Sequence, residues 1–453
     1  MVLQKVIGPQ FDIIEDYVAK GLLRADQGRT IAQQAQFMRI DPEVVLQQTS
    51  FCFGHYPSSS LMQHHLAEHA PQNLWQPDAQ HPMAPPTDFV RQELHLVQQD
   101  ENFAKSFVLA LLWDAVRERV SDIHLSPEDF FVRVRYRLDG VLSERFVFHQ
   151  AFWSRILVCL KITANLDIAE TRKPQSGRFE ETIDGRIIDC RLSTMPTVDG
   201  ENLVIRLLDR LNALIPLADL GYGADQRSLL QRMVSQQEGL IVVTGPTGSG
   251  KTTTLYALLQ HLADESRNVM TLEDPVEYRL PLIRQSEVKE ASGLGFAAGV
   301  RAILRQDPDV ILISEIRDEA TALAALRAAL TGHLVLATVH ANNAFGVIHR
   351  LLDLGLPAPY LASSLRGIIS QRLLRRRQGR GYAGRVAIAE IINVSESLKL
   401  QIAHGASLVE LRRTAMAEGF IPLHTRAENY IRDGITDVEE VRRVLPWFEE
   451  PAP

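Results

Sequence analysis

The eight residues from Gly245 to Thr252 read GPTGSGKT and combine residue types that suit phosphate binding. Their spacing is that of a P-loop, and they lie between the strand-like GLIVVT and the helix-like TTTLYALLQHL. Glycines let backbone N–H groups converge on phosphate oxygens at the start of a helix, where the helix dipole favours an anion. The pattern predicts a nucleotide site formed by Gly245, Pro246, Thr247, Gly248, Ser249, Gly250, Lys251, Thr252 and Thr253.

Two side chains of this run have distinct expected roles. Lys251 is placed to reach the β- and γ-phosphates, and the Thr252 hydroxyl is placed to hold Mg²⁺. The alternative interpretation is a glycine-rich turn without a ligand, but a strand before it and a helix after it favour the phosphate site. We therefore expect a nucleoside triphosphate and Mg²⁺ as ligands.

Polar residues also end three further strand-like runs. NVMTL ends at Glu273, DVILI at Ser314-Glu315, and LVLATV at His340. The carboxyl ends of parallel strands meet at one edge of a sheet, so these side chains are expected to face one nucleotide. One carboxylate must order Mg²⁺, partly through water, and another must orient or deprotonate the attacking water. Glu273 and Glu315 are the candidates, and their spacing does not assign the two roles. His340 is the candidate for a hydrogen bond to the γ-phosphate.

Composition limits the class of protein that carries this site. The 453 residues include 48 Lys and Arg against 55 Asp and Glu, so the net charge is −7 and no global attraction to nucleic acid is expected. The three cysteines are widely spaced, which excludes a disulfide framework or a Cys-x-x-Cys zinc site and fits a reducing cytoplasm. No apolar run approaches the roughly 18 to 20 residues that span a bilayer, so membrane contact is expected only through partners.

The chain is predicted to have five parts. Apolar spacings of three and four indicate short helices at the N-terminus, and five prolines between Pro71 and Pro86 indicate an extended linker. The parts are a helical region at 1–70, a Pro-rich linker at 71–89, an α+β domain at 90–208, a second linker at 209–223, and an α/β domain with a helical C-terminal part at 224–453.

Within the α+β domain, two tight hairpins are expected. Val132, Val134, Tyr136 and Leu138 alternate with arginines, which is typical of a half-buried strand. Asp139-Gly140 directly follows, and Asp184-Gly185 repeats the same turn dipeptide. In the last domain, buried apolar strands alternate with helices, which indicates a parallel sheet.

Four segments together resemble a known family. GPTGSGKTTTLYALL, TLEDPVEY, RAILRQDPDVILISEIRD and ALTGHLVLATVHANNA resemble, in order, the Walker A, Asp box, Walker B and His box of secretion ATPases. The chain is similar to the type II secretion and type IV pilus assembly ATPases (GspE/PulE and PilB), and more distantly to the retraction motor PilT. VSDIHLSP, KPQSGRF and RLSTMPTVDGENLVIRLLD resemble the family's preceding domain.

The resemblance implies a RecA-like ATPase that forms a cytoplasmic homohexamer at the inner membrane. Hydrolysis of ATP to ADP and phosphate would drive assembly of a pilus or pseudopilus through an inner-membrane platform protein. His333, in the His box, is expected at the nucleotide. Arg178, Arg191 and Arg206 match arginines of the family's preceding domain, which the resemblance suggests faces the ATP of a neighbouring subunit.

One departure from the family concerns zinc. Assembly ATPases usually carry two Cys-x-x-Cys pairs after the QRL segment, whereas QRLLRRRQGRGYAGR has no cysteine, so no zinc is predicted. Two alternatives remain open: a nucleic-acid motor with a RecA-like core, and a pilus retraction ATPase. The acidic composition disfavours the first, and the long N-terminal extension with KPQSGRF disfavours the second.

Overall fold

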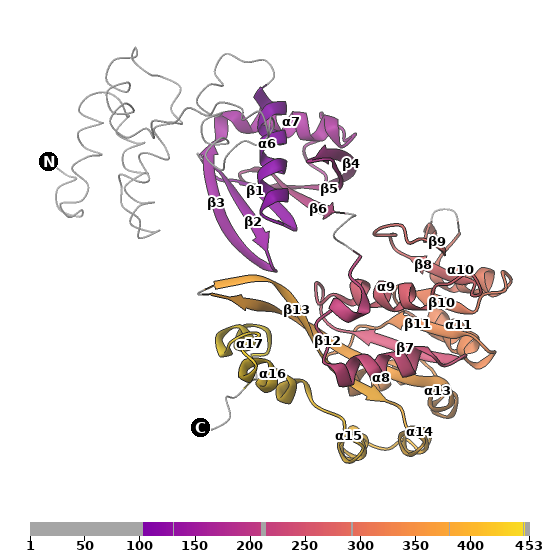
Figure 1. Ribbon diagram of the computed structural model, residues 1–453. Helices are drawn as coiled ribbons and strands as arrows, with labels where there is room; N and C mark the ends of the chain where they lie inside the picture. The colour runs from indigo at the N-terminus through magenta and orange to yellow at the C-terminus, as the bar shows by residue number, and fades with distance from the viewer. Residues whose placement is uncertain are drawn as a thin grey trace, which may run out of the picture. The chain divides into compact units, whose positions relative to one another are not determined.

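The computed structural model describes residues 103–129, 131–209, 214–290, 293–379, 381–446 and 448. The chain divides into two compact units, with the boundary between Asp209 and Arg210 (Figure 1). The predicted helical region at 1–70 and linker at 71–89 lie outside the described residues. Within the described ranges, no helix is long and apolar enough to cross a membrane.

The first unit contains a six-stranded sheet in the order β3-β2-β1-β6-β5-β4, with antiparallel neighbours throughout. Helices α6 (Phe103–Arg117) and α7 (Trp153–Thr163) pack together beside it (Figure 1). The strands are β1 (Asp122–Pro127), β2 (Phe131–Leu138), β3 (Val141–His149), β4 (Gln175–Ile183), β5 (Arg186–Thr197) and β6 (Gly200–Asp209).

Strand β2 shows why this sheet forms. Val132, Val134 and Tyr136 are buried, while the arginines between them are partly exposed, as the alternating pattern predicts. Both predicted hairpin turns are confirmed: Asp139 and Gly140 have φ values of 46° and 84°, and Asp184 and Gly185 of 55° and 71°. Two consecutive positive φ values match the right-handed twist of the flanking strands.

The second unit contains a seven-stranded sheet in the order β13-β12-β7-β11-β10-β8-β9. Neighbouring strands run parallel except for β12 and β13, which are antiparallel. The strands are β7 (Gly239–Thr244), β8 (Val269–Glu273), β9 (Ile283–Glu287), β10 (Val310–Ile313), β11 (Leu334–Thr338), β12 (Leu365–Gln378) and β13 (Gly381–Asn393).

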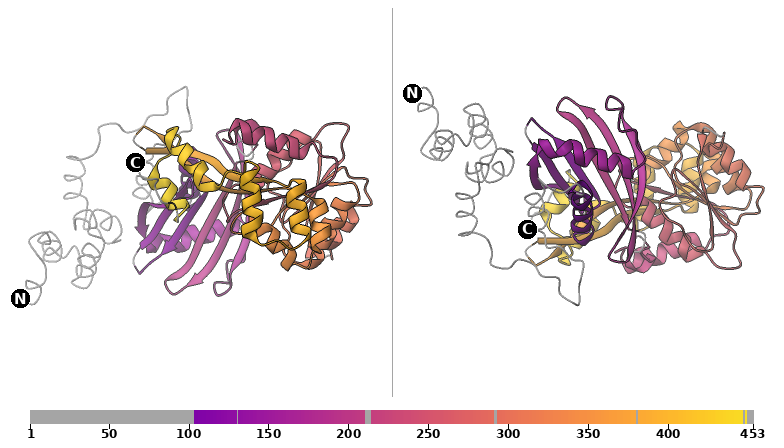
Figure 2. Two further views of the ribbon diagram at one scale, coloured as in Figure 1. Left: turned by 90° about the horizontal axis from the view of Figure 1, so that it is seen from below. Right: turned by 90° about the horizontal axis from the view of Figure 1, so that it is seen from above.

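Helices cover both faces of this sheet (Figure 2). Leu240 and Val242 of β7 belong to one buried cluster and Ile241 and Val243 to another, which is why the strand is apolar at every position. The helices are α8 (Ala224–Val234), α9 (Lys251–Leu262), α10 (Phe296–Ile303), α11 (Glu319–Leu330), α12 (Ala344–Asp353), α13 (Ala358–Ser364), α14 (Glu396–Ala403), α15 (Leu408–Ala417), α16 (Leu423–Arg432) and α17 (Val438–Val444), with a short 3₁₀ helix η3 at Leu217–Asp219.

The cysteine-free QRLLRRRQGRGYAGR run, for which no zinc is predicted, lies in the β12–β13 hairpin. Helices α16 and α17 pack against it over a buried apolar cluster (Figure 1). The carboxylate of Glu440, fully buried at the start of α17, accepts hydrogen bonds from Arg375 at 2.8 Å and from Arg443 at 2.6 and 2.7 Å. The guanidinium of Arg375 also lies over the Tyr382 ring, 4.0 Å from its centroid. Paired charges thus hold the C-terminal helix on the hairpin.

We predict that Glu440→Gln destabilises the protein by about 3 kcal/mol, because it leaves Arg375 and Arg443 without their buried counter-charge. Burial raises the pKa of Glu440, but hydrogen bonds from Arg443 and Arg375 outweigh it, so the net pKa is lowered. The stabilisation is therefore present above the unfolded pKa of about 4.3 and lost on acidification. Thermal unfolding at pH 7 should show a lower midpoint for Glu440→Gln than for the wild type. The difference between the two midpoints should become smaller below about pH 4.

Glu439→Gln is the matched control, since this neighbouring side chain is exposed. Equal unfolding midpoints for the two variants would contradict a structural role for the buried carboxylate.

Candidate functional site

The phosphate-binding loop, residues 245–250, connects β7 to α9. Gly250 has φ 85° and directly precedes Lys251, the first residue of α9. A Cβ on Gly245 would lie 2.5 Å from the Gln371 carbonyl oxygen, so only glycine allows the loop to approach β12 this closely. The unpaired N–H groups at the start of α9 therefore border a tightly packed loop, which suits binding of an anion.

Lys251 folds back onto this loop. Its ammonium donates to the carbonyl oxygens of Gly245 at 2.9 Å and Pro246 at 3.2 Å. Burial lowers the pKa of Lys251, while the nearby Glu315 carboxylate opposes the shift. Thr252 is exposed, and among the described residues the buried Ser249 hydroxyl has no hydrogen-bond partner. The hydroxyls and the lysine are thus available to a ligand, which would replace weak contacts to the loop's own carbonyls.

Glu315 follows the end of β10 and connects several strand ends. Its carboxylate lies 2.8 Å from Arg317 Nη2 and 3.0 Å from His340 Nε2. Burial raises the pKa of Glu315, but the Arg317 hydrogen bond and charge, together with His340 and Lys251, lower it overall. The carboxylate is therefore ionised at neutral pH. The end of β7 is tied to the His340 loop by Thr244 Oγ1, which donates to the Val339 carbonyl at 2.7 Å.

Glu273, the last residue of β8, has a different environment. Only 1% of it is exposed, and its carboxylate accepts hydrogen bonds from Thr271 at 2.6 Å and Gln285 at 3.0 Å. The Tyr256 hydroxyl donates to its other oxygen. A carboxylate held by three donors is a fixed structural acceptor in this conformation, whereas Glu315 is partly exposed. The environment, not the position at a strand end, distinguishes the two glutamates.

Arg372 is a cation near this site that the sequence interpretation missed. It is 9% exposed, and its guanidinium donates to the carbonyl oxygens of Gln371 and Asn342, each at 3.0 Å. Its charge contributes to lowering the pKa of Lys251, so the two cations are close. The available signal was the polar Ser-Gln-Arg stretch between the apolar pairs Ile368-Ile369 and Leu373-Leu374.

Comparisons with known proteins decide the family. Residues 97–443 match the family model described as "Type II/IV secretion system protein". The chain belongs to this family. Type II secretion system protein HxcR of Pseudomonas aeruginosa is 42% identical over 355 residues, which cover 74% of this chain and 76% of the relative. Type II secretion system ATPase E of Vibrio cholerae is 38% identical over 395 residues, which cover 77% of this chain and 76% of the relative.

Solved structures agree with this assignment to the type II/IV secretion family. The pilus retraction motor PilT with bound ADP has a TM-score of 0.56 at 27% identity, covering 76% of this chain and 97% of PilT. DotB of Legionella pneumophila has a TM-score of 0.62 at 21% identity, and the match covers 77% of this chain and 97% of DotB. At this identity the likeness supports the fold alone. The chain is thus a secretion-family ATPase with the expected RecA-like α/β fold.

His333 does not lie with the other predicted site residues of this secretion ATPase. It precedes β11, and its carbonyl accepts a hydrogen bond from Gly239 N at the start of β7. It is therefore at the amino ends of the parallel strands, whereas the phosphate-binding loop is at their carboxyl ends. Strand β11 spans Leu334–Thr338, so the separation along the strand is about 15 Å at roughly 3.3 Å per residue. His333 and the phosphate-binding loop thus lie at opposite ends of the parallel strands, and a contact of His333 with the nucleotide stays a prediction.

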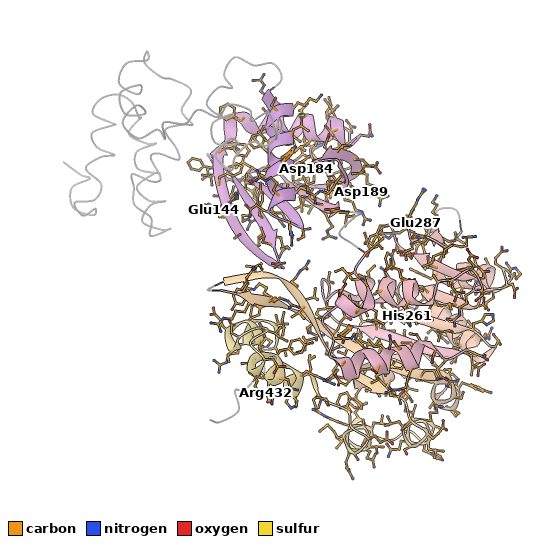
Figure 3. The ribbon with its side chains drawn as sticks, viewed as in Figure 1. Glu144, Asp184, Asp189, His261, Glu287 and Arg432 are labelled. Atoms are coloured by element: carbon orange, nitrogen blue, oxygen red, sulfur yellow. The ribbon has the colours of Figure 1, made fainter. Side chains whose placement is uncertain are left out.

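The three predicted arginines of the first unit form a row across its sheet. Arg178 of β4 is opposite Arg191 of β5, and Arg191 is opposite Arg206 of β6. Directly opposed residues point to the same face, so the sheet presents three neighbouring cations. Arg206 Nε donates to Asp122 at 2.9 Å, and the Arg206 side chain is 59% exposed. Asp184, labelled in Figure 3, lies in the turn between the strands that carry the other two arginines.

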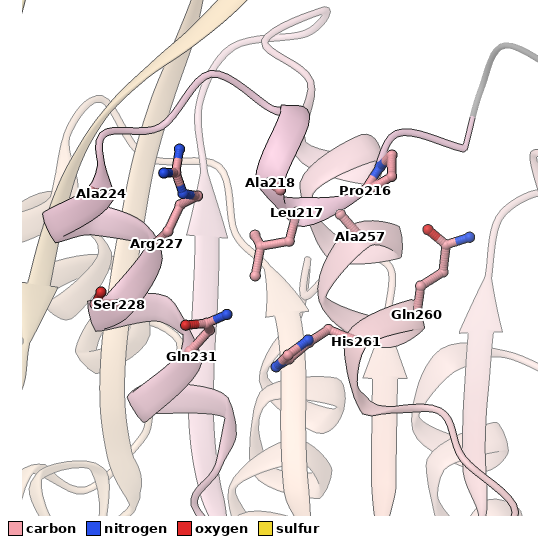
Figure 4. Close-up of a pocket in the computed structure, with 10 residues that line it drawn as sticks. All are labelled: Pro216, Leu217, Ala218, Ala224, Arg227, Ser228, Gln231, Ala257, Gln260 and His261. Carbon is pink, nitrogen blue, oxygen red and sulfur yellow. The ribbon is translucent and has the colours of Figure 1, made fainter.

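A pocket of about 560 Å³ lies between η3, α8 and α9 (Figure 4). Its lining includes Leu217, Arg227, Gln231, Gln260 and His261. Gln260 and His261 belong to the C-terminal part of α9, while the phosphate-binding loop precedes the first residue of this helix. The pocket is thus distinct from the loop that the sequence predicts to bind nucleotide.

Because Glu273 is buried and Glu315 is partly exposed, their substitution should affect stability differently. Glu273→Gln should lower the unfolding midpoint, at a cost of about 1–3 kcal/mol, because an amide NH₂ would replace an acceptor that faces hydroxyl and amide donors. Glu315→Gln should cost less than about 1 kcal/mol, since its ion pairs are partly exposed. Differential scanning calorimetry of both variants at pH 7 provides the measurement. A larger loss for Glu315→Gln than for Glu273→Gln would contradict this assignment.

Proposed function

We propose that this chain is a cytoplasmic, homohexameric motor that couples ATP hydrolysis to assembly of a type II secretion pseudopilus or a type IV pilus. The observation that carries the proposal is the convergence of Lys251, Glu315 and His340 from the ends of three strands, in a chain related to type II secretion proteins. The two type II secretion relatives reported above are 42% and 38% identical, whereas the retraction motor PilT is 27% identical. Assembly is therefore favoured over retraction.

In this proposal, groups of the chain itself bind the phosphates and activate the attacking water. Backbone N–H groups of the phosphate-binding loop and of the first turn of α9 bind the phosphates together with the Lys251 ammonium, and His340 hydrogen-bonds the γ-phosphate. Glu315, kept ionised by its cationic neighbours, orients the attacking water. Glu273 supports the end of β8 through its three hydrogen bonds instead of acting as the base.

The residues at the loop fit Mg²⁺. The exposed Thr252 hydroxyl and the Glu315 carboxylate are hard oxygen donors, and Mg²⁺ commonly uses only one or two protein ligands beside phosphates and water. When bound, Mg²⁺ neutralises charge on the β- and γ-phosphate oxygens. We propose no zinc site, since paired charges around Glu440 hold the region where relatives of the assembly branch carry cysteines.

The arginine row supports a site completed by a neighbouring subunit. Arg178, Arg191 and Arg206 lie side by side on adjacent strands, and Arg206 keeps 59% of its side chain exposed beside its partner Asp122, so this row suits binding of an anion. In the proposed homohexamer this anion is the ATP of the neighbour, whose γ-phosphoryl charge is spread over its oxygens in the transition state. The motor acts on an inner-membrane platform protein, contacts the membrane only through partners, and does not bind nucleic acid. The net charge of −7 disfavours the alternative of a nucleic-acid motor.

The proposed site is tested by Lys251→Ala. The variant should lose ATP binding and reduce phosphate release at least about 100-fold, because the positive charge on the β- and γ-phosphates is removed. Glu315→Gln should keep ATP binding and slow hydrolysis by about 100-fold or more. Lys105→Ala, an exposed lysine of α6, is the control and should behave as wild type. Phosphate release near the wild-type rate in Lys251→Ala would refute the assignment of this loop.

Completion of the site between subunits is tested by mixing variants. Arg191→Ala and Lys251→Ala chains should each be inactive and regain ATPase activity when mixed, because some interfaces then combine an intact loop with an intact arginine. Specific activity of the wild type should also rise with protein concentration as rings form. Arg172→Ala, whose side chain is 89% exposed, should be active alone. No recovery under conditions where subunits demonstrably exchange would rule out the trans arrangement.

A further inference from the structure

Gln371 of β12 is a buried polar side chain that joins three separate segments. It is 0% exposed, and its Nε2 donates to the Ser249 carbonyl of the phosphate-binding loop at 2.7 Å. Its Oε1 accepts from Tyr222 Oη at 2.7 Å and from Thr254 Oγ1 of α9 at 2.9 Å. A single carboxamide thus connects the loop, the helix that follows it and the segment before α8.

The orientation of this carboxamide follows from its partners. The Ser249 carbonyl can only accept a hydrogen bond, so the NH₂ group of Gln371 must face it. The two hydroxyls can both donate, so they satisfy the oxygen at the other side of the amide. Tyr222 and Thr254 therefore hold Gln371 in the orientation that contacts the loop.

The contact fixes part of the loop backbone. In a planar trans peptide the C=O and the following N–H point in opposite directions. Because Gln371 holds the Ser249 carbonyl, the Gly250 N–H points away from β12. A Cβ on Gly250 would lie 3.1 Å from Gln371 Nε2, so the loop also packs directly on the amide. Gln371 thereby sets the direction of an N–H at the start of α9, where phosphate binding is proposed.

Tyr222 is itself firmly placed. It is 1% exposed and lies in a segment that enters the second unit shortly after its first residue, Arg210. Ala387 N donates to the Leu220 carbonyl at 3.1 Å, and the Tyr430 hydroxyl donates to the Gly221 carbonyl at 2.8 Å. The two residues before Tyr222 are thus anchored on β13 and α16.

We propose that Gln371 is a positioning residue of the phosphate-binding loop and that Tyr222, by holding Gln371, links the segment entering the second unit to that loop. This inference rests on the proposed nucleotide site. It predicts that loss of the carboxamide weakens nucleotide binding beyond any loss of stability. It also predicts that the effect of Tyr222 passes through Gln371.

The test compares Gln371→Leu with Gln226→Leu in the full chain. Gln226 is the matched control because it is also buried and donates to a backbone carbonyl, that of Ala389, at 2.7 Å without contacting the loop. Both variants should lower the unfolding midpoint. Only Gln371→Leu should raise the Kd for fluorescent mant-ATP and the KM for ATP, each about tenfold, with kcat changed by less than about threefold.

Tyr222→Phe tests the second half of the proposal. It keeps the ring and removes the hydroxyl that donates to Gln371, so the Kd for mant-ATP should rise about threefold. In the Gln371→Leu background the same substitution should have no further effect on Kd, since its target is already absent. Additive effects of the two substitutions would overturn the link between Tyr222 and Gln371.

Failure of the inference and failure of the proposed site give different results. If Gln371→Leu and Gln226→Leu have equal Kd values while Lys251→Ala abolishes binding, the loop binds nucleotide but Gln371 does not position it. If Lys251→Ala binds mant-ATP as wild type does, the proposed nucleotide site itself is wrong. A rise in Kd common to both glutamine variants also overturns the inference, because it would reflect general destabilisation.

Discussion

The unpaired backbone N–H groups at the start of α9 are the constraint on which the second unit depends. Such groups need a partner, and a tight glycine loop can offer them to an anion only if its own backbone is fixed. Neighbouring strands provide that fixation, since Thr244 bonds to the His340 loop and Gln371 of β12 bonds to the Ser249 carbonyl. The parallel sheet therefore does more than place residues at one edge: it holds the loop in a shape that suits phosphate.

Glu273 and Glu315 have different electrostatic environments, although each lies at or just after the carboxyl end of a parallel strand. Glu273 is enclosed by three hydrogen-bond donors, and Glu315 faces Arg317, His340 and the vicinity of Lys251. A carboxylate saturated by fixed donors stabilises the end of its strand. A partly exposed carboxylate beside cations stays ionised and accessible, which is what water activation requires.

Paired charges help to hold the C-terminal helices on the β12–β13 hairpin. The buried Glu440 carboxylate is paired with Arg375 and Arg443, and Arg375 stacks on Tyr382. Buried carboxylates are tolerated when their oxygens are fully hydrogen-bonded, and here two guanidinium groups satisfy them. The arginine-rich QRLLRRRQGRGYAGR run thus includes a structural residue, Arg375, which pairs with Glu440.

The sequence by itself determined the features that depend on local backbone geometry. The glycines of the phosphate-binding loop and the Asp-Gly hairpins are recognisable because positive φ angles restrict residue type at one or two positions. The alternation of β2 and the apolar run of β7 similarly report which faces are buried. These signals sufficed for the α/β class. The secretion ATPase family followed from the resemblance of four motif segments, and the comparisons confirm it.

Only the tertiary structure decided the environment of each polar group, because its partners are far away in sequence. Gln371 meets Thr254 across 117 positions, and Glu273 meets Tyr256 and Gln285 from different elements. Membership of His333 in a motif likewise does not say which end of a strand it occupies, and only the structure places it before β11. Hydrogen bonding and burial are properties of assembled neighbours, and they separate a structural glutamate from a candidate catalytic one.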